Sequence, residues 1–285
     1  MKTVLQTIQS GTPYLEKAGV ESARLNMEYM LAHVMGCKRM DLYLRFNEPL
    51  EEKTLGPLRD LTRRRAKREP LQHLLGTVEF MGREFRSDAR ALIPRPETEE
   101  LVEKILAHYK KLGLPPPARI LDMGTGSGVI GLSLAHAFPT AHVTLADISP
   151  DALTLAQENA DKTALPAGRA SFILTNLFQN LTGGPFDLLV ANLPYIAADE
   201  MPTLSAEVQR DPALALDGGA IGTEIILDFL AQLHPHAAPG AFIALEIGAG
   251  QSSAILPVME NFALQQSRSV PDYSGRDRFL FAIAP

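Results

Sequence analysis

The tetrapeptide Asn192-Leu193-Pro194-Tyr195 carries groups that could hold a planar NH2 group. It follows the apolar run 186–191, which is typical of a buried strand. The asparagine side chain offers a hydrogen-bond acceptor, the proline stiffens the turn and the tyrosine supplies an aromatic ring. We interpret this stretch as the active site.

A glycine-rich segment offers backbone N–H groups to a ligand. Its glycines are Gly124, Gly126 and Gly128, with Thr125 and Ser127 between them. Glycines let the backbone approach a ligand closely, and the N-terminus of the following helix presents free N–H groups. The spacing departs from the G-x-G-x-x-G fingerprint, because valine stands where the third glycine belongs, and there is no G-K-[ST]. A loop that holds one nucleoside and its amino-acid tail is favoured over a pyrophosphate loop.

Two residues that follow other strands could complete a nucleoside site. Asp147 ends a strand-like run about twenty residues after the loop, where a carboxylate can accept hydrogen bonds from both ribose hydroxyls. Its alternative role is to cap the helix that begins near Pro150. Leu177 follows the next strand and could wall the base, with ordinary core packing as its alternative. In a doubly wound sheet the first and fourth strands are neighbours, so we expect Gly124 and Asn192 to lie side by side.

The absence of other reactive sets limits the chemistry. No Ser/His/Asp set, metal-spaced His/Cys cluster or carboxylate pair stands out, so position and electrostatics must drive the reaction. Methyl transfer from a sulfonium fits, because it is an in-line displacement by an already activated donor. If the Asn192 side-chain oxygen and the Leu193 carbonyl accept both protons of an NH2 group, they orient its nitrogen and hold the developing charge. Tyr195 can stack against the planar group.

Three segments position these residues. Residues 1–75 show helical apolar spacing and are predicted to form a small helical domain, and residues 76–90 alternate around a glycine as a β-hairpin. Residues 91–285 begin with a helix and then alternate strands with helices, which indicates a parallel sheet. Their last two strand-like runs, 263–270 and 278–284, have only a short turn between them, so they should pair antiparallel. The predicted fold is α/β, a seven-stranded Rossmann-like sheet with a terminal antiparallel hairpin.

Composition and charge indicate which compartment and which partners to expect. The 285 residues are 46% hydrophobic, and the single cysteine, Cys37, excludes an internal disulfide, so we expect a cytoplasmic protein. The start lacks a signal-peptide core and no apolar stretch reaches the ~18 residues of a membrane helix, so no membrane is expected. Residues 1–75 hold 13 Lys+Arg and 9 Asp+Glu, a balance of +4, and the remainder holds 14 and 24, a balance of −10. The acidic second part disfavours a nucleic-acid partner.

The chain resembles the S-adenosylmethionine-dependent glutamine methyltransferases of peptide-chain release factors over essentially its full length. The matching segments are 69–73, 93–99, 122–128, 215–219, 245–248 and 272–277, of which Ile-Pro-Arg-Pro-Glu-Thr at 93–98 is the most specific. The resemblance implies S-adenosyl-L-methionine as cofactor, S-adenosyl-L-homocysteine as product and no metal. It also implies class-1 release factors as partners, methylated on the glutamine of Gly-Gly-Gln. The implied cofactor-binding residues are Gly124, Thr125, Gly126, Ser127, Gly128, Asp147, Leu177 and Asn192, and the implied substrate-binding residues are Asn192, Leu193, Pro194 and Tyr195.

Two departures from that family keep alternatives open. The family usually has proline where this chain has Leu193, and the leucine form resembles the ribosomal RNA adenine dimethyltransferases. Methylation of adenine N6 in ribosomal RNA or DNA is therefore the alternative, although those enzymes carry their small helical domain behind the catalytic one. Leu177 stands where the family often has an aromatic residue beside the adenine. A binding module without catalysis is a third class, against which the intact Asn192, Pro194 and Tyr195 count.

An arginine-rich helix, 59–68, ends the helical domain. A solvated helix face is its simplest interpretation. The alternative is that it recognises the large protein substrate outside the tripeptide, which would make residues 1–75 a substrate-recognition domain.

Overall fold

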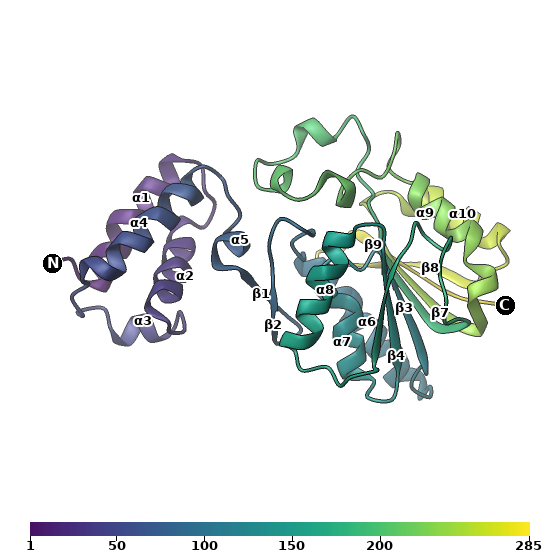
Figure 1. The fold of residues 1–285 in the computed structure, drawn as a ribbon. Coiled ribbons are helices and arrows are strands. Elements are labelled where there is room, and N and C mark those ends of the chain that lie inside the picture. The colour runs from purple at the N-terminus through teal and green to yellow at the C-terminus, as the bar shows by residue number, and fades with distance from the viewer. The chain divides into compact units, whose positions relative to one another are not determined.

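The computed structural model describes all residues 1–285, which form two compact units (Figure 1). The first unit contains residues 1–77 and 205–210, and the second contains residues 78–204 and 211–285. None of the helices combines the length and the apolar character that crossing a bilayer requires.

The first unit is helical. Its helices are α1 (Val4–Lys17), α2 (Ala23–Met35), α3 (Asp41–Leu44), α4 (Glu52–Ala66) and α5 (Leu71–Leu75). A capping box starts α1, because the Thr3 hydroxyl accepts the Gln6 N–H and the Gln6 side chain accepts the Thr3 N–H. Apolar side chains of α1, α2 and α4, with Leu42, Leu50 and Leu74, form one buried core.

The arginine-rich helix α4 is not a uniform solvated face. Arg65 is 6% exposed and donates hydrogen bonds to Asn26 Oδ1 at 2.7 Å and to Glu207 Oε1 at 2.9 Å. Glu207 belongs to the segment 205–210, and its carboxylate also pairs with Arg68. Arg63 and Arg64 are exposed and are paired with Asp60 and Glu69. The arginines therefore divide into a buried structural set and an exposed, largely neutralised set.

The second unit is an α/β sheet with an added hairpin. Its strands are β1 (Thr77–Phe80), β2 (Arg83–Arg86), β3 (Arg119–Met123), β4 (His142–Asp147), β5 (Ala170–Leu174), β6 (Phe186–Asn192), β7 (Ala237–Glu246), β8 (Gln265–Pro271) and β9 (Asp277–Ile283). Strands β1 and β2 pair as a separate hairpin, as predicted, with a tight turn at Met81 and Gly82. The other seven form one sheet in the order β5-β4-β3-β6-β7-β9-β8.

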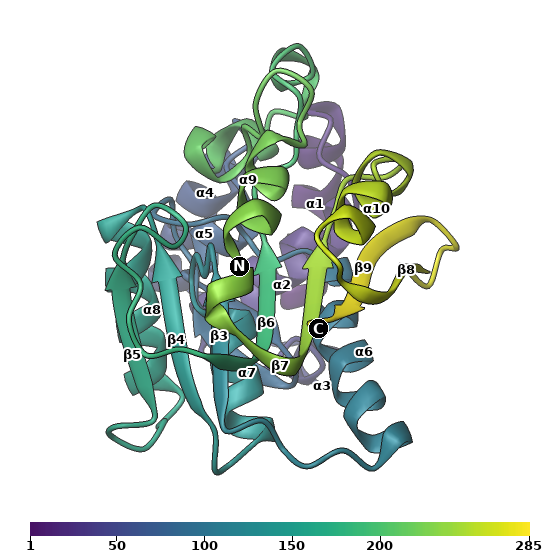
Figure 2. The same ribbon diagram turned by 90° about the vertical axis from the view of Figure 1, so that its right-hand side faces the viewer.

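The sheet order places the site. Strands β3 to β7 are parallel, whereas β9 runs antiparallel to β7 and β8 antiparallel to β9, which confirms the predicted terminal hairpin (Figure 2). The chain moves outward from β3 to β5 and then returns to β6 on the other side of β3. Met123 pairs with Ala191, so Gly124 and Asn192 leave adjacent strands at the same edge. The order reverses between β3 and β6, which is where ligands bind in such sheets.

Helices cover both faces of the sheet. They are α6 (Pro96–Leu112), α7 (Val129–Ala137), α8 (Pro150–Lys162), α9 (Glu224–Gln232) and α10 (Ser252–Asn261). Side chains of α6, α7 and α8 pack into one core, with Leu101 and Leu132 fully buried, and side chains of α9 and α10 pack into the other, with Phe229 fully buried. Pro96 at the first position and acidic residues in the first turn begin α6, as predicted.

Candidate active site

A cavity of about 380 Å³ lies at the carboxyl ends of β3, β4 and β6. Its lining includes most of the predicted site residues: Gly124, Thr125, Gly126, Ser127, Asp147, Leu177, Asn192, Leu193 and Pro194. Gly128 and Tyr195 do not line it. The side chains contain no group of three or more His, Cys, Asp or Glu arranged to hold a metal ion.

Strand β4 holds the glycine loop in place through hydrogen bonds. The N–H groups of Gly124 and Thr125 both donate to the Ala146 carbonyl, at 2.8 and 3.1 Å, and the Gly126 N–H donates to Asp147 Oδ2 at 2.8 Å. Gly124 has a φ of +70°, and a Cβ there would lie 3.0 Å from Leu193 Cδ2. Gly124 is therefore required both by its backbone conformation and by the close approach of the tetrapeptide.

Asp122 supports the same loop from below. Its side chain is fully buried, and its Oδ2 accepts hydrogen bonds from the Thr125 hydroxyl at 2.6 Å and from the Gly131 N–H at 2.8 Å. Burial raises the pKa of Asp122 to about 6, and these two hydrogen bonds act in the opposite direction. Asp122 fastens the loop to the first turn of α7 and does not line the cavity.

Gly128 serves helix packing. It is the N-cap of α7 with a φ of +83°, and a Cβ at this position would lie 3.1 Å from Ala156 Cβ on α8. The residue lets α7 and α8 approach each other beside the loop. Its predicted contact with the cofactor stays a prediction.

Asp147 lies in the wall of the cavity and already accepts two backbone hydrogen bonds. Oδ1 accepts the Ser149 N–H at 2.9 Å and Oδ2 accepts the Gly126 N–H at 2.8 Å. The cap of α8 is Ser149, whose hydroxyl accepts the Ala152 N–H, so the cap role considered for Asp147 is filled by another residue. Burial raises the pKa of Asp147, and its backbone hydrogen bonds oppose that shift. Each carboxylate oxygen keeps a further lone pair that a ribose hydroxyl could use.

Asn192 is oriented by a residue of α6. Its Nδ2 donates to the Thr98 hydroxyl at 3.2 Å, and this is its only side-chain hydrogen bond, so Oδ1 has no donor from the chain. Thr98 is 3% exposed and also lines the cavity. Thr98 belongs to the Ile-Pro-Arg-Pro-Glu-Thr segment, but the sequence alone did not indicate a role for its side chain. The signal that could have identified it is a hydroxyl on the inward face of an otherwise apolar helix pattern.

The turn of the tetrapeptide is packed against two distant segments. Gln251 Nε2 donates to the carbonyls of Tyr195 and Gly222, at 2.9 and 3.1 Å. A Cβ on Gly218 would lie 2.7 Å from the Pro194 carbonyl oxygen, so only glycine fits there. The segment 215–219, which the sequence marked only by resemblance, thus supports the backbone of the candidate site.

The Tyr195 side chain is directed toward Glu246. Its hydroxyl lies 3.5 Å from Glu246 Oε1, and the Arg278 guanidinium lies 6.0 Å from its ring centre. Burial raises the pKa of Tyr195 to about 12, so the hydroxyl stays protonated at neutral pH. The stacking of Tyr195 on a substrate stays a prediction.

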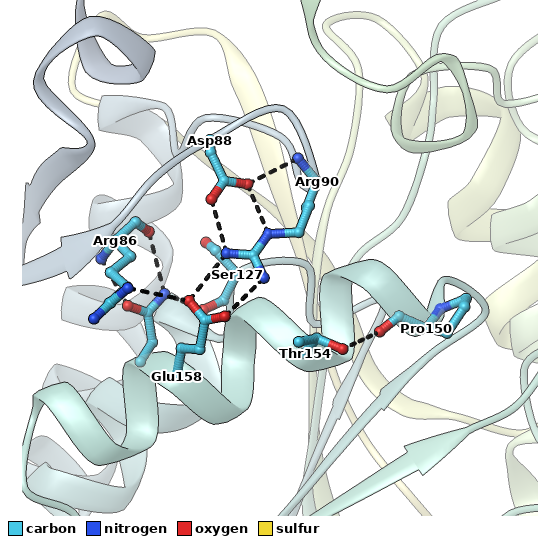
Figure 3. A network of polar contacts seen from close by, with 8 residues as sticks. Arg86, Asp88, Arg90, Ser127, Pro150, Thr154 and Glu158 are labelled. Carbon is cyan, nitrogen blue, oxygen red and sulfur yellow. Dashed lines mark hydrogen bonds and ion pairs between the residues drawn. The ribbon is translucent and has the colours of Figure 1, made fainter.

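The rim of the cavity is fastened to α8 by charged and amide groups. Arg90, which lines the cavity, lies between Asp88 and Glu158 with contacts of 2.8 and 2.9 Å (Figure 3). Fully buried Asn159 accepts the Arg86 N–H at 2.6 Å and donates to the Ser127 carbonyl at 2.9 Å. The end of the β-hairpin and the glycine loop are thus joined through one helix.

The second unit has the fold of known methyltransferases. A 16S rRNA methyltransferase from T. thermophilus, whose structure contains AdoMet and guanosine, has the same fold, with a TM-score of 0.53, 19% identity and coverage of 73% of this chain and 50% of that one. Residues 6–76 match the family model of the PrmC N-terminal domain, and residues 101–218 match that of the methyltransferase small domain.

Sequence relatives define the family. The release factor glutamine methyltransferase of Moorella thermoacetica is 41% identical over 285 residues, covering 98% of both chains. That of Geobacter sulfurreducens is 38% identical over 283 residues, covering 98% of this chain and 95% of that one. The chain belongs to the release factor glutamine methyltransferase family, as the resemblance implied.

Proposed function

We propose that this protein transfers a methyl group from S-adenosyl-L-methionine to the side-chain amide nitrogen of the glutamine in the Gly-Gly-Gln tripeptide of class-1 release factors. The observation that carries the proposal is the Asn192 amide, which lines the cavity beside the glycine loop and has an Oδ1 without a donor from the chain. A planar NH2 group needs such an acceptor. Relatives named for glutamine methylation favour a glutamine over an adenine.

The residues of the cavity fit this cofactor. Asp147 can accept from ribose hydroxyls, and Leu177 is half-buried in the wall, where it can contact a base. The backbone of the glycine loop can approach an amino-acid tail, because Gly124 and Gly126 have no side chains. When bound, the cofactor supplies a methyl group on a sulfonium, which needs no metal for activation. The expected products are the N-methyl amide, S-adenosyl-L-homocysteine and the proton that the nitrogen loses.

The protein's task is to orient a weak nucleophile. Asn192 Oδ1 and the Leu193 carbonyl accept the two N–H protons of the substrate amide, which directs the nitrogen into the cavity and holds the positive charge that develops on it. Pro194 keeps Leu193 in extended geometry, so its carbonyl stays in place. Leu193 is 5% exposed, which excludes water from these hydrogen bonds and strengthens them.

The helical unit is proposed to recognise the release factor outside the tripeptide, and the reaction is proposed to take place in the cytoplasm. Arg59 and Arg63 are exposed on α4, where each is paired with a surface carboxylate that acidic groups of a protein partner could replace. Arg65 is excluded from this role because its side chain is buried against Asn26 and Glu207.

A labelling experiment tests the function. Purified protein is incubated with tritiated S-adenosylmethionine and a class-1 release factor, or with the same factor in which the Gly-Gly-Gln glutamine is replaced by alanine. Label should enter the first substrate and not the second. The Asn192→Ala variant should bind the cofactor but not transfer the label. Label in ribosomal RNA or DNA, with none in the release factor, would show that the adenine alternative is correct.

A further inference from the structure

A buried polar chain lies behind Asn192. Asn192 on β6 pairs in register with Glu246 on β7, and the Asn192 amide donates to the Thr98 hydroxyl on α6, which in turn acts to lower the pKa of Glu246. Glu246 is 1% exposed, and its Oε2 has no hydrogen-bond partner. Such a carboxyl is costly to bury, which makes a structural role alone a poor explanation for it.

The chemistry of a hydroxyl makes this chain directional. The Thr98 hydroxyl has one hydrogen to donate and two lone pairs that accept. When its hydrogen is directed to an ionised Glu246, only its lone pairs face Asn192, so Asn192 must turn its NH2 group toward Thr98. The amide is planar, and its oxygen is then left for the cavity. If Thr98 instead donated to Asn192, the NH2 group would face the substrate and could not accept its protons.

We propose that Thr98, with Glu246 behind it, is a positioning residue that fixes the Asn192 amide with its oxygen available to the substrate. The proposal rests on the proposed function for the identity of the substrate. It extends that function by adding two residues that do not touch the reacting atoms. These residues determine whether the oxygen or the NH2 group of Asn192 faces the substrate.

The charges around Glu246 predict how this orientation depends on pH. Burial raises the pKa of Glu246 to about 7, against the opposing effects of Thr98, Arg278 and Tyr195, while Glu97 adds to the rise. Below this pKa the protonated carboxyl can donate to Thr98, which is then free to donate to Asn192 Oδ1. The productive amide orientation is therefore present above about pH 7 and lost as the pH falls.

Two matched variants test the hydroxyl. Thr98→Val replaces the hydroxyl by a methyl group of similar size, and Thr98→Ser keeps it. For Thr98→Val we expect kcat on the release factor to fall about 10- to 100-fold, by analogy with the outer hydrogen-bond partners of metal ligands, whose removal costs that much. Cofactor affinity and the thermal midpoint should change little, because the shape is kept. Thr98→Ser should restore kcat to within about threefold of the unchanged protein.

Glu246→Gln tests the direction of the chain. Its amide does not ionise and can donate to Thr98 as well as accept from it, so kcat at high pH should fall, and the inflection expected near pH 7 for the unchanged protein should disappear. An independent readout uses ¹⁵N-asparagine labelling. The side-chain NH2 signal of Asn192, identified by its loss in Asn192→Ala, should exchange slowly with water and should shift and exchange faster in Thr98→Val.

The outcomes separate the two proposals. Full activity of Thr98→Val, or equal losses in Thr98→Val and Thr98→Ser, would overturn the positioning role. An Asn192 NH2 signal that is unchanged in Thr98→Val would overturn it as well, whatever the substrate proves to be. If the unchanged protein does not label the release factor, the proposed function fails, and the NMR comparison still decides the orientation of Asn192.

Discussion

Asp147→Asn is the substitution that most directly tests how the cavity holds its cofactor. The two oxygens of Asp147 accept separate N–H groups, from Gly126 at 2.8 Å and from Ser149 at 2.9 Å. Asparagine has nearly the same shape but replaces one oxygen by an NH2 group, which cannot accept. Either the glycine loop or the start of α8 then loses its partner, and the ribose hydroxyls of the proposed cofactor would lose a charged acceptor.

The expected loss follows from the number of hydrogen bonds affected. A hydrogen bond to a charged group contributes about 1.5 to 3 kcal/mol. Since each 1.4 kcal/mol is a factor of ten in affinity, the Kd for S-adenosylmethionine should rise about 10- to 150-fold. Burial raises the pKa of Asp147, so the carboxylate takes up its proton at a higher pH than an ordinary aspartate. As the pH falls, the affinity of the unchanged protein for S-adenosylmethionine should therefore weaken before the ordinary carboxyl range is reached, and the variant should lack this dependence.

Isothermal titration calorimetry with S-adenosylmethionine measures the change. Asp151→Asn is the matched control, because Asp151 is an exposed acid in the first turn of the same helix and does not line the cavity. The control should bind the cofactor as the unchanged protein does. A Kd for Asp147→Asn within threefold of that of the control would refute the assignment of Asp147 to the cofactor.

Three further substitutions probe separate parts of the molecule. Glu207→Ala leaves Arg65, which is 6% exposed, without its carboxylate, and should destabilise the helical unit by about 2 to 4 kcal/mol in urea unfolding; an unchanged midpoint would contradict this. Gly131→Ala places a Cβ 2.9 Å from Asp122 Oδ2 and should lower stability by about 1 to 3 kcal/mol, measured by thermal unfolding; a thermal midpoint equal to that of the unchanged protein would contradict this. Leu177→Phe adds an aromatic face to the cavity and should tighten cofactor binding about 2- to 10-fold by calorimetry; an unchanged affinity would show that residue 177 does not contact the base.

The sheet could be predicted because its evidence is local in the chain. Apolar runs such as 119–123 and 186–191 are short, lie between turns, and alternate with helical patterns, so their type and direction follow from the sequence. The rule that ligands bind where the strand order reverses then predicted that Gly124 and Asn192 lie together. The register of β3 and β6 confirms that these two residues follow paired strand ends.

The polar support of the site could not be predicted in the same way. Thr98 and Asn192 are 94 residues apart, and no periodic pattern relates a hydroxyl on α6 to an amide on β6. The role of segment 205–210 could not be predicted either. In the sequence Glu207 resembles an ordinary loop residue, but in the structure the buried Arg65 donates to its carboxylate. Contacts of this kind depend on how whole elements pack, which the spacing of apolar residues does not encode.

Leu193 shows how a tertiary contact changes the meaning of a sequence departure. In the sequence, leucine in place of proline resembled enzymes that methylate RNA. In the structure, its Cδ2 lies 3.0 Å from where Gly124 would carry a Cβ, and its side chain belongs to the core under the sheet edge. The leucine therefore fills the space that Gly124 leaves open and packs the glycine loop against the turn that carries the proposed substrate acceptors. Its backbone remains restricted by Pro194, so the feature that the chemistry requires, a carbonyl held in extended geometry, does not depend on proline at this position.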